Sequence, residues 1–271
     1  LHPIMTVLAL AITILLLPGP ATLWVFISTS STHGRLDNPQ ALLPQSSELS
    51  HPARLDIAEL CGLAIGASFL VDSIIAFVLV LLGAFSISLL FAFITGYLLT
   101  LALIAVLRRS RFSLKPFIPK NELITLAGVV IGVSLSLALY SRPSETILLL
   151  RDPATYINTA VNIAETGSAI IPDDLYKGFN DDLQSTLVYE RPVDEEVESA
   201  NRFGGYQVEY RLRGFPWDAS RDITIPQFFT LLPTWQAIGY SLKGLDGALF
   251  ISPILAALSV YFIFLLGRRL F

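Results

Sequence analysis

The side chains best suited to chemistry lie between Arg142 and Ile225, a polar stretch with long apolar segments on either side. Asp152 opens a predicted helix here, because Asp suits the N-cap, Pro153 the first helical position and Gly167 the C-terminal stop. The partial positive charge at a helix N-terminus stabilises a negative carboxylate. Asp152 therefore either only caps the helix or also accepts a proton as a general base, and both roles stay open.

Arginines follow later in the same stretch, interleaved with tyrosine and tryptophan: Arg202, Arg211, Arg213 and Arg221. The planar guanidinium group matches the geometry of phosphate oxygens. One or more of these arginines could hold a phosphate at the level of lipid headgroups. The alternative is that they pair with the acidic residues nearby.

Clustered carboxylates are a third chemical feature, at Asp173-Asp174, Asp181-Asp182 and Asp194-Glu195-Glu196. Such oxygen ligands suit a divalent cation such as Mg²⁺ or Mn²⁺, and a solvated acidic loop is the other interpretation. The three histidines all lie before residue 52. This argues against a histidine-ligated metal or a Ser-His-Asp hydrolase. Asp173 and Asp174 are the predicted metal ligands.

Composition indicates what surrounds these groups. The chain of 271 residues is 53% hydrophobic and only 15% charged, against about 25% charged in a soluble domain. This predicts an integral membrane protein with the lipid bilayer as its environment. The net charge of -4 does not favour nucleic acid as a partner, and the single cysteine, Cys61, excludes an internal disulfide.

The apolar segments predict a polytopic bundle of transmembrane helices. Leu1–Ser28 is either a signal peptide or, as we expect, a helix kinked or re-entrant at Pro18-Gly19-Pro20. Leu55–Arg108 is long enough for a hairpin of two spans, turning at Gly83-Ala84-Phe85-Ser86. Leu123–Tyr140 and about Ala248–Leu266 are the next spans.

Asp72 lies inside the first span of that hairpin. A charge in mid-membrane costs at least ~2.5 kcal/mol. Asp72 is therefore either a site residue or a protonated or hydrogen-bonded group that faces protein.

Charge bias predicts the orientation of the spans. The stretch from Arg108 to Lys120 holds only basic charges, and Arg268-Arg269 follow the last span. The positive-inside rule places both in the cytoplasm, so residues 142–225 form a large extracytoplasmic loop. That loop holds 15 of the 22 acidic residues. We expect amphipathic interfacial helices in it, and another near Pro226–Gln236.

The helix from Asp152 to Gly167 is the first of these. Its predicted apolar stripe is Ile157, Ala160, Val161 and Ala164. Asn158, Asn162 and Glu165 are predicted to face the other way. We therefore expect the helix to lie on the membrane surface or against the bundle.

Four short motifs occur in order along the second half of the chain. They are R-D-P-x-T-Y-x-N from Arg151, T-G-S-x-x-I-P-D from Thr166, P-Q-F-F-x-L-x-P from Pro226 and L-G-R-R-L-F from Leu266. Their order and membrane placement resemble the start of the GT-C superfamily of membrane glycosyltransferases. More narrowly, the chain is similar to the mannosyltransferase-like proteins of family 39, over about Leu123–Phe271.

The resemblance implies a division of the chain and a function. Residues 1–120 would be an accessory membrane module of about three spans, and residues 121–271 the start of a catalytic module with its outer loop at 142–225. The protein would sit in the cell membrane as a multi-pass enzyme. It would transfer a sugar from a polyprenyl-phosphate donor to an unidentified acceptor on the extracytoplasmic face.

The resemblance also assigns roles to residues. Asp152 falls on the catalytic base, and Arg151 and Tyr156 match the same motif. Together with Arg211, Arg213 and Arg221, these two are the predicted substrate-binding residues. We expect the chain to be part of a longer protein. The alternative function is a non-catalytic membrane assembly or transport subunit, for which Asp72 would be the sensitive residue.

Overall fold

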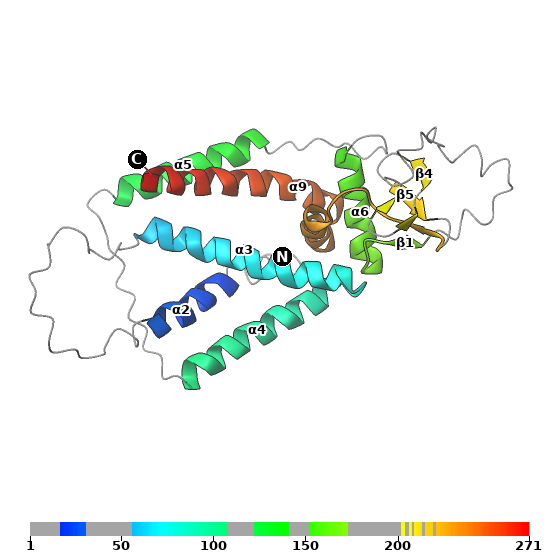
Figure 1. Cartoon of the computed structure of the whole chain (residues 1–271). Coiled ribbons are helices and arrows are strands. Elements are labelled where there is room, and N and C mark those ends of the chain that lie inside the picture. The colour runs from blue at the N-terminus through cyan, green and yellow to red at the C-terminus, as the bar shows by residue number, and fades with distance from the viewer. Residues whose placement is uncertain are drawn as a thin grey trace, which may run out of the picture. The chain divides into compact units, whose positions relative to one another are not determined.

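The structure is a computed structural model that is mainly helical. It describes residues 17–30, 56–107, 122–140, 152–172, 202–203, 206–207, 209–212, 215–218 and 221–270. The helices are α2 (Pro18–Ser30), α3 (Ile57–Leu81), α4 (Ile87–Leu107), α5 (Glu122–Tyr140), α6 (Asp152–Thr166) and α9 (Leu231–Leu270) (Figure 1).

Four of the described helices are long and apolar enough to cross a membrane, namely α3, α4, α5 and α9. Their length fits the roughly 20 residues that a bilayer requires. The chain is therefore a membrane protein, as its composition predicts. The α2 helix is shorter, and the residues before position 17, where the first apolar segment begins, lie outside the described part.

The predicted hairpin of α3 and α4 is confirmed. Gly83 has a φ of 65°, a left-handed conformation that glycine adopts without strain. The Ser86 hydroxyl then accepts a hydrogen bond from Leu89 N at 3.2 Å and caps the start of α4. Gly83 and Ser86, the first and last residues of the predicted turn, therefore end α3 and cap α4.

The chain divides into two compact units, and α3, α4 and α9 each contribute residues to both. Unit 1 holds residues 1–72, 91–141 and 253–271, and unit 2 holds residues 73–90 and 142–252. Each unit is built from separate stretches of the chain, because the α3–α4 hairpin brings residues that are distant in sequence together. The predicted division at residue 120 stays a prediction.

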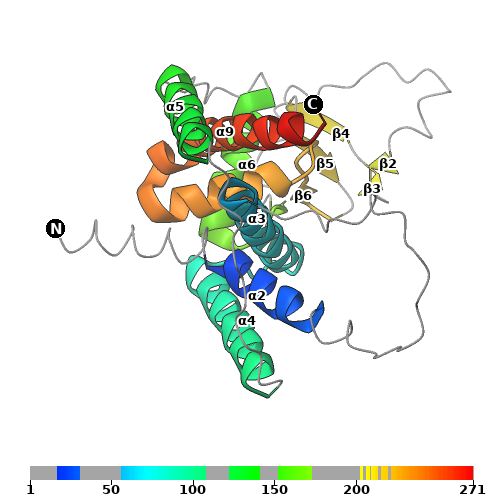
Figure 2. The ribbon, with the colours of Figure 1, turned by 90° about the vertical axis from the view of Figure 1, so that its left-hand side faces the viewer.

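In unit 1, α2 packs against both α3 and α4, as Figures 1 and 2 show from two sides. Gly19 N donates to Ser68 Oγ at 2.7 Å, which requires the backbones to approach closely. Thr22 Oγ1 and Tyr97 OH lie 2.8 Å apart and share a hydrogen bond. Val25 is buried with residues of α4 in a small apolar cluster.

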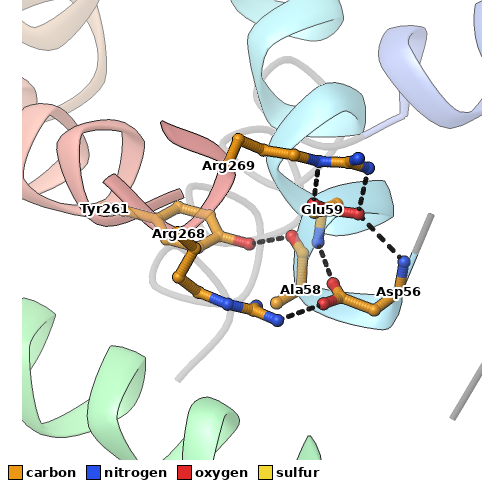
Figure 3. A network of polar contacts seen from close by, with 6 residues as sticks. All are labelled: Asp56, Ala58, Glu59, Tyr261, Arg268 and Arg269. Atoms are coloured by element: carbon orange, nitrogen blue, oxygen red, sulfur yellow. Dashed lines mark hydrogen bonds and ion pairs between the residues drawn. The ribbon is translucent and has the colours of Figure 1, made fainter. Parts of the chain in front are cut away.

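Charged side chains join the first turn of α3 to the last turn of α9, also within unit 1 (Figure 3). Asp56 Oδ1 accepts from Glu59 N at 2.8 Å and Glu59 Oε2 accepts from Asp56 N at 3.1 Å, a reciprocal cap. Arg268 Nη2 then donates to Asp56 Oδ2 at 2.6 Å, and Arg269 Nη2 to Glu59 Oε2 at 2.8 Å. The two helix ends therefore lie side by side. The assignment of Arg268 and Arg269 to the cytoplasm stays a prediction.

The α9 helix bends sharply between Lys243 and Gly244. Gly244 has φ 63° and ψ −150°, and this left-handed φ, which glycine adopts without strain, breaks the helix here. The two arms then meet at Gly239 and Gly247, where an added Cβ would lie 2.4 Å and 2.0 Å from the other residue's carbonyl oxygen. The predicted last span, about Ala248–Leu266, lies in the second arm, and the described helix is longer at both ends.

A small β-sheet lies in unit 2, and the sequence analysis did not predict it. Its strands are β1 (Ile171–Pro172), β6 (Ile223–Thr224), β5 (Phe215–Asp218) and β4 (Glu209–Leu212), antiparallel and in that order. A separate pair joins β2 (Arg202–Phe203) to β3 (Tyr206–Gln207). The loop at 142–225 therefore holds strands as well as the expected helix at α6, because backbone pairing between distant segments forms this sheet.

Candidate functional site

Asp152 is the first residue of α6 and its side chain is exposed. Pro153 follows as the second residue of the helix, so the helix begins one residue earlier than predicted. In the part of the chain that the structure describes, no hydrogen bond to the Asp152 carboxylate is found. An exposed carboxylate at a helix N-terminus is accessible to a reacting group.

Contacts along α6 fix the helix that carries Asp152. Ile157 is buried together with Ala248 and Leu249 of α9. Near the other end, Tyr240 OH donates to Glu165 Oε1 at 3.2 Å. All of these residues belong to unit 2. The helix therefore packs against α9 at two points, which positions its N-terminus.

The C-terminal end of α6 is held by the turn of the α3–α4 hairpin, also within unit 2. Phe85 N donates to Gly167 O at 3.1 Å. Gly167 has a φ of 84°, and an added Cβ would lie 3.0 Å from two carbonyl oxygens of that turn. Only glycine fits here without movement of the backbone, so the predicted helix stop is confirmed with a second, packing reason.

The buried face of α6 differs from the predicted stripe. Ile157 and Ala160 are buried as predicted, but Val161 and Ala164 are only half-buried. The other buried residues are Ala154, Thr155, Thr159 and Ile163. Tertiary contacts rather than hydrophobicity alone select the face, so polar threonine side chains replace part of the expected apolar stripe.

Asn162 was predicted to lie on the polar face of α6, away from the apolar stripe, but its side chain is half-buried. Its Nδ2 donates to Ser168 O at 2.7 Å, so the side chain fastens the turn after the helix. Glu165 is exposed as predicted, with the Tyr240 contact at its tip. Asn158 is half-buried and donates to Ala154 O at 2.8 Å.

Tyr156 is brought close to Asp152, because residues four apart lie on the same face of a helix. Its ring is half-buried against Phe228, with centroids 5.1 Å apart and planes tilted by 34°. Phe228 belongs to the P-Q-F-F motif. Two of the four sequence motifs therefore meet through these rings.

Arg221 pairs with an acidic residue, one of the two alternatives that the sequence allows. Its Nε lies 3.9 Å from Asp218 Oδ2, and the side chains are 57% and 1% exposed. The mostly exposed arginine neutralises a buried carboxylate at the end of β5. The structure does not place Arg221 beside Asp152.

The remaining predicted site residues are described in part or not at all. Arg211 lies in β4, where only the backbone is described. Outside the described residues lie Arg151, Arg213, Asp173 and Asp174. Among the residues that are described, no group of three or more His, Cys, Asp or Glu side chains could hold a metal. The metal prediction at Asp173 and Asp174 stays a prediction.

No family model, no curated protein and no solved structure matches the chain. The residues themselves must therefore carry the functional argument.

Asp72 is the second carboxyl group that the sequence singles out. It is fully buried in α3, and neither of its oxygens has a hydrogen-bond partner in the described part of the chain. Asp72 therefore faces protein, as predicted for a group without a role in a site. The hydrogen bond that this prediction allowed is not found among the described residues. An unpaired buried carboxyl is costly, which makes Asp72 a candidate site in its own right.

Sequence reasoning missed two other buried polar groups, Thr159 Oγ1 and Gln236 Oε1. Both lack a hydrogen-bond partner among the described residues, and both lie in unit 2. For Thr159 a signal was present, because Thr155 and Thr159 are one turn apart on the buried face. For Gln236 we find no local signal.

Proposed function

We propose that this membrane protein is a glycosyltransferase that transfers a sugar from a polyprenyl-phosphate donor to an acceptor hydroxyl on the extracytoplasmic face. The observation that carries the proposal is the Asp152 carboxylate. It is exposed at the N-terminus of a helix whose other end is bonded to the α3–α4 turn. The order of the four motifs supports the same function.

In the proposed reaction Asp152 acts as the general base. It takes the proton of the acceptor hydroxyl while that oxygen attacks the anomeric carbon of the sugar. The bond between the anomeric carbon and the phosphate oxygen breaks, and the polyprenyl phosphate leaves with the bonding electron pair. The configuration at the anomeric carbon is inverted, because attack and departure occur on opposite faces.

Arginines are proposed to stabilise the leaving phosphate, through Arg151, Arg211 or Arg213. Arg221 is a weaker candidate, because it already pairs with Asp218. A divalent cation held by Asp173 and Asp174 would supply the same stabilisation of negative charge. Tyr156 lies on the Asp152 face of α6 and is proposed to border the sugar site.

Replacing Asp152 by Asn in the full-length protein tests the base. Transfer from a panel of radiolabelled polyprenyl-phosphate sugars, measured in membranes, should fall by a factor of about 100 or more. Asp246→Asn is the matched control, because Asp246 is 77% exposed in α9 and its Oδ2 lies 4.0 Å from Lys243 Nζ. Undiminished transfer by the Asp152→Asn protein would reject the assignment.

A second candidate function is a membrane assembly or transport subunit without chemistry. The observation that favours it is Asp72, since buried carboxyls within spans mark conduction paths. If this function is correct, Asp72→Asn abolishes transport or assembly in cells, and Asp152→Asn does not. It also predicts that the purified protein does not bind polyprenyl phosphate, which a lipid-binding assay decides.

A further inference from the structure

An apolar groove of about 480 Å³ runs between α3 and α9 in unit 1, with Leu23 of α2 at its border. Its volume lies within the ~300–1,000 Å³ usual for ligand sites. Of the described residues that line it, Glu59 and Arg269 are charged and the others are apolar or glycine. Of the residues proposed for sugar transfer, none that the structure describes borders it.

The groove exists because α3 presents small residues where α9 presents large ones. At Gly66 an added Cβ would meet only the Phe262 ring, at 3.7 Å, which is ordinary contact distance. At Gly62 the space is closed by Leu265, whose Cδ1 would lie 2.3 Å from an added Cβ. Gly66 is therefore the position at which a larger side chain would fill the groove.

The surroundings of the groove identify the kind of molecule that fills it. Both walls belong to helices that can cross a membrane. The solvent around such helices is the hydrocarbon of lipid chains, and an empty apolar groove would lose dispersion contacts along its whole length. A flexible acyl chain fits these requirements.

Two ion pairs lie where α3 begins and α9 ends, and one of them, between Glu59 and Arg269, lines the groove (Figure 3). Their charges indicate which headgroup the ligand carries. Arg269 donates to both carboxylate oxygens of Glu59, yet its side chain stays 44% exposed. A guanidinium group has more N–H donors than these two contacts use. The neighbouring pair, Arg268 and Asp56, adds no net charge. This end of the groove is therefore polar but neutral, which complements a zwitterionic headgroup better than an anionic one.

We infer that the groove binds one zwitterionic phospholipid, with an acyl chain along Gly66 and Phe262 and the headgroup at the Glu59–Arg269 pair. The lipid phosphate accepts hydrogen bonds from Arg269 donors that Glu59 does not use. The ammonium group lies toward Glu59. The site is distinct from the proposed sugar-transfer site in unit 2 and does not depend on that function.

Native mass spectrometry of the full-length protein tests the site. The protein is released from nanodiscs that contain equal amounts of phosphatidylethanolamine and phosphatidylglycerol. We expect one retained phosphatidylethanolamine in the wild type and a loss of about tenfold in occupancy for Gly66→Trp. Gly128→Trp in α5 is the control, since an added Cβ there meets nothing within 4 Å and Gly128 lies outside the groove. Arg269→Gln should keep a lipid but lose the preference between headgroups.

Three outcomes overturn the inference: wild-type occupancy in Gly66→Trp, an equal loss in Gly128→Trp, or retention of phosphatidylglycerol in place of phosphatidylethanolamine. A measurement on the unchanged protein covers the case in which Gly66→Trp fails to fold. A phosphatidylethanolamine with a photoreactive acyl chain should crosslink mainly to residues 59–70 and 262–269. Equal crosslinking to residues 122–140 of α5 would show a nonspecific lipid annulus instead.

Discussion

Asp56, which caps α3, and Asp72, which lies within α3, are two buried carboxyl groups with opposite surroundings. Asp56 is 5% exposed, caps the first turn of α3 and pairs with Arg268 at 2.6 Å. Asp72 is 0% exposed, and both of its oxygens lack a partner in the described part of the chain. Burial alone therefore does not distinguish a structural carboxyl group from a candidate functional one.

The difference lies in what each group contributes to folding. The contacts of Asp56 offset the cost of removing its charge from water, so its presence needs no further explanation. The contacts described for Asp72 offset nothing, so the residue costs stability where it stands. A residue that is kept at such a cost is a better candidate for function, and the same substitution at both positions tests this.

The largest effect is expected for Asp56→Asn. Asparagine still caps a helix, but the ion pair is lost and Arg268 remains, with its side chain 31% exposed. Breaking a fully buried pair costs about 3–5 kcal/mol, and partial exposure reduces this to roughly 1–3 kcal/mol. Unfolding of the full-length protein in detergent, followed by circular dichroism, measures the change. If the protein keeps its wild-type stability, the ion pair does not hold these helix ends together.

A smaller effect on stability is expected for Asp72→Asn. The substitution preserves shape and removes no described partner, so the free energy of unfolding should change by less than about 1 kcal/mol. The same unfolding measurement gives the value, with Asp56→Asn as its comparison. A loss as large as that for Asp56→Asn would show that Asp72 has a partner or a bound cation.

The sequence predicts the long elements because their signals are local. The span of α5 and the turn at Gly83 and Ser86 follow from apolar length and from the two residue types that end and cap helices. The helix at Asp152 follows from Pro153 and Gly167 in the same way. In each case the residue type that starts or ends the helix lies at that end of the helix, so a short stretch of sequence is enough to predict it.

The sheet could not be predicted because its signals are not local. Ile171–Pro172 pairs with Ile223–Thr224, far away in the sequence. The central strand β5 contains Pro216, a residue that usually argues against a central strand, and its pairing with β4 has an irregular register. Strands of two to four residues carry too little alternation to be recognised.

For the candidate site, sequence reasoning gave the position of Asp152 and its neighbour Tyr156 on one helix. It did not give the buried face of α6, on which Thr159 and Ile163 are buried and Val161 is not, because burial depends on distant parts of the fold. It also did not reveal the capping contacts that bury Asp56. Asp72 stood out from composition alone, but only the packing shows that it lacks a partner.

An effect no larger than that of Asp72→Asn is expected for Glu59→Gln, which weakens the second ion pair beside Asp56. Arg269 is 44% exposed, so solvent screens the pair, and its loss should cost no more than about 0.5–1 kcal/mol. Glutamine can still accept the bond from Asp56 N and complete the reciprocal cap. The Glu59→Gln, Asp56→Asn and double variants form a mutant cycle, measured by the same unfolding experiment. A coupling above about 0.5 kcal/mol would mean that the two pairs act as one unit, so that Asp56 owes part of its stability to its neighbour.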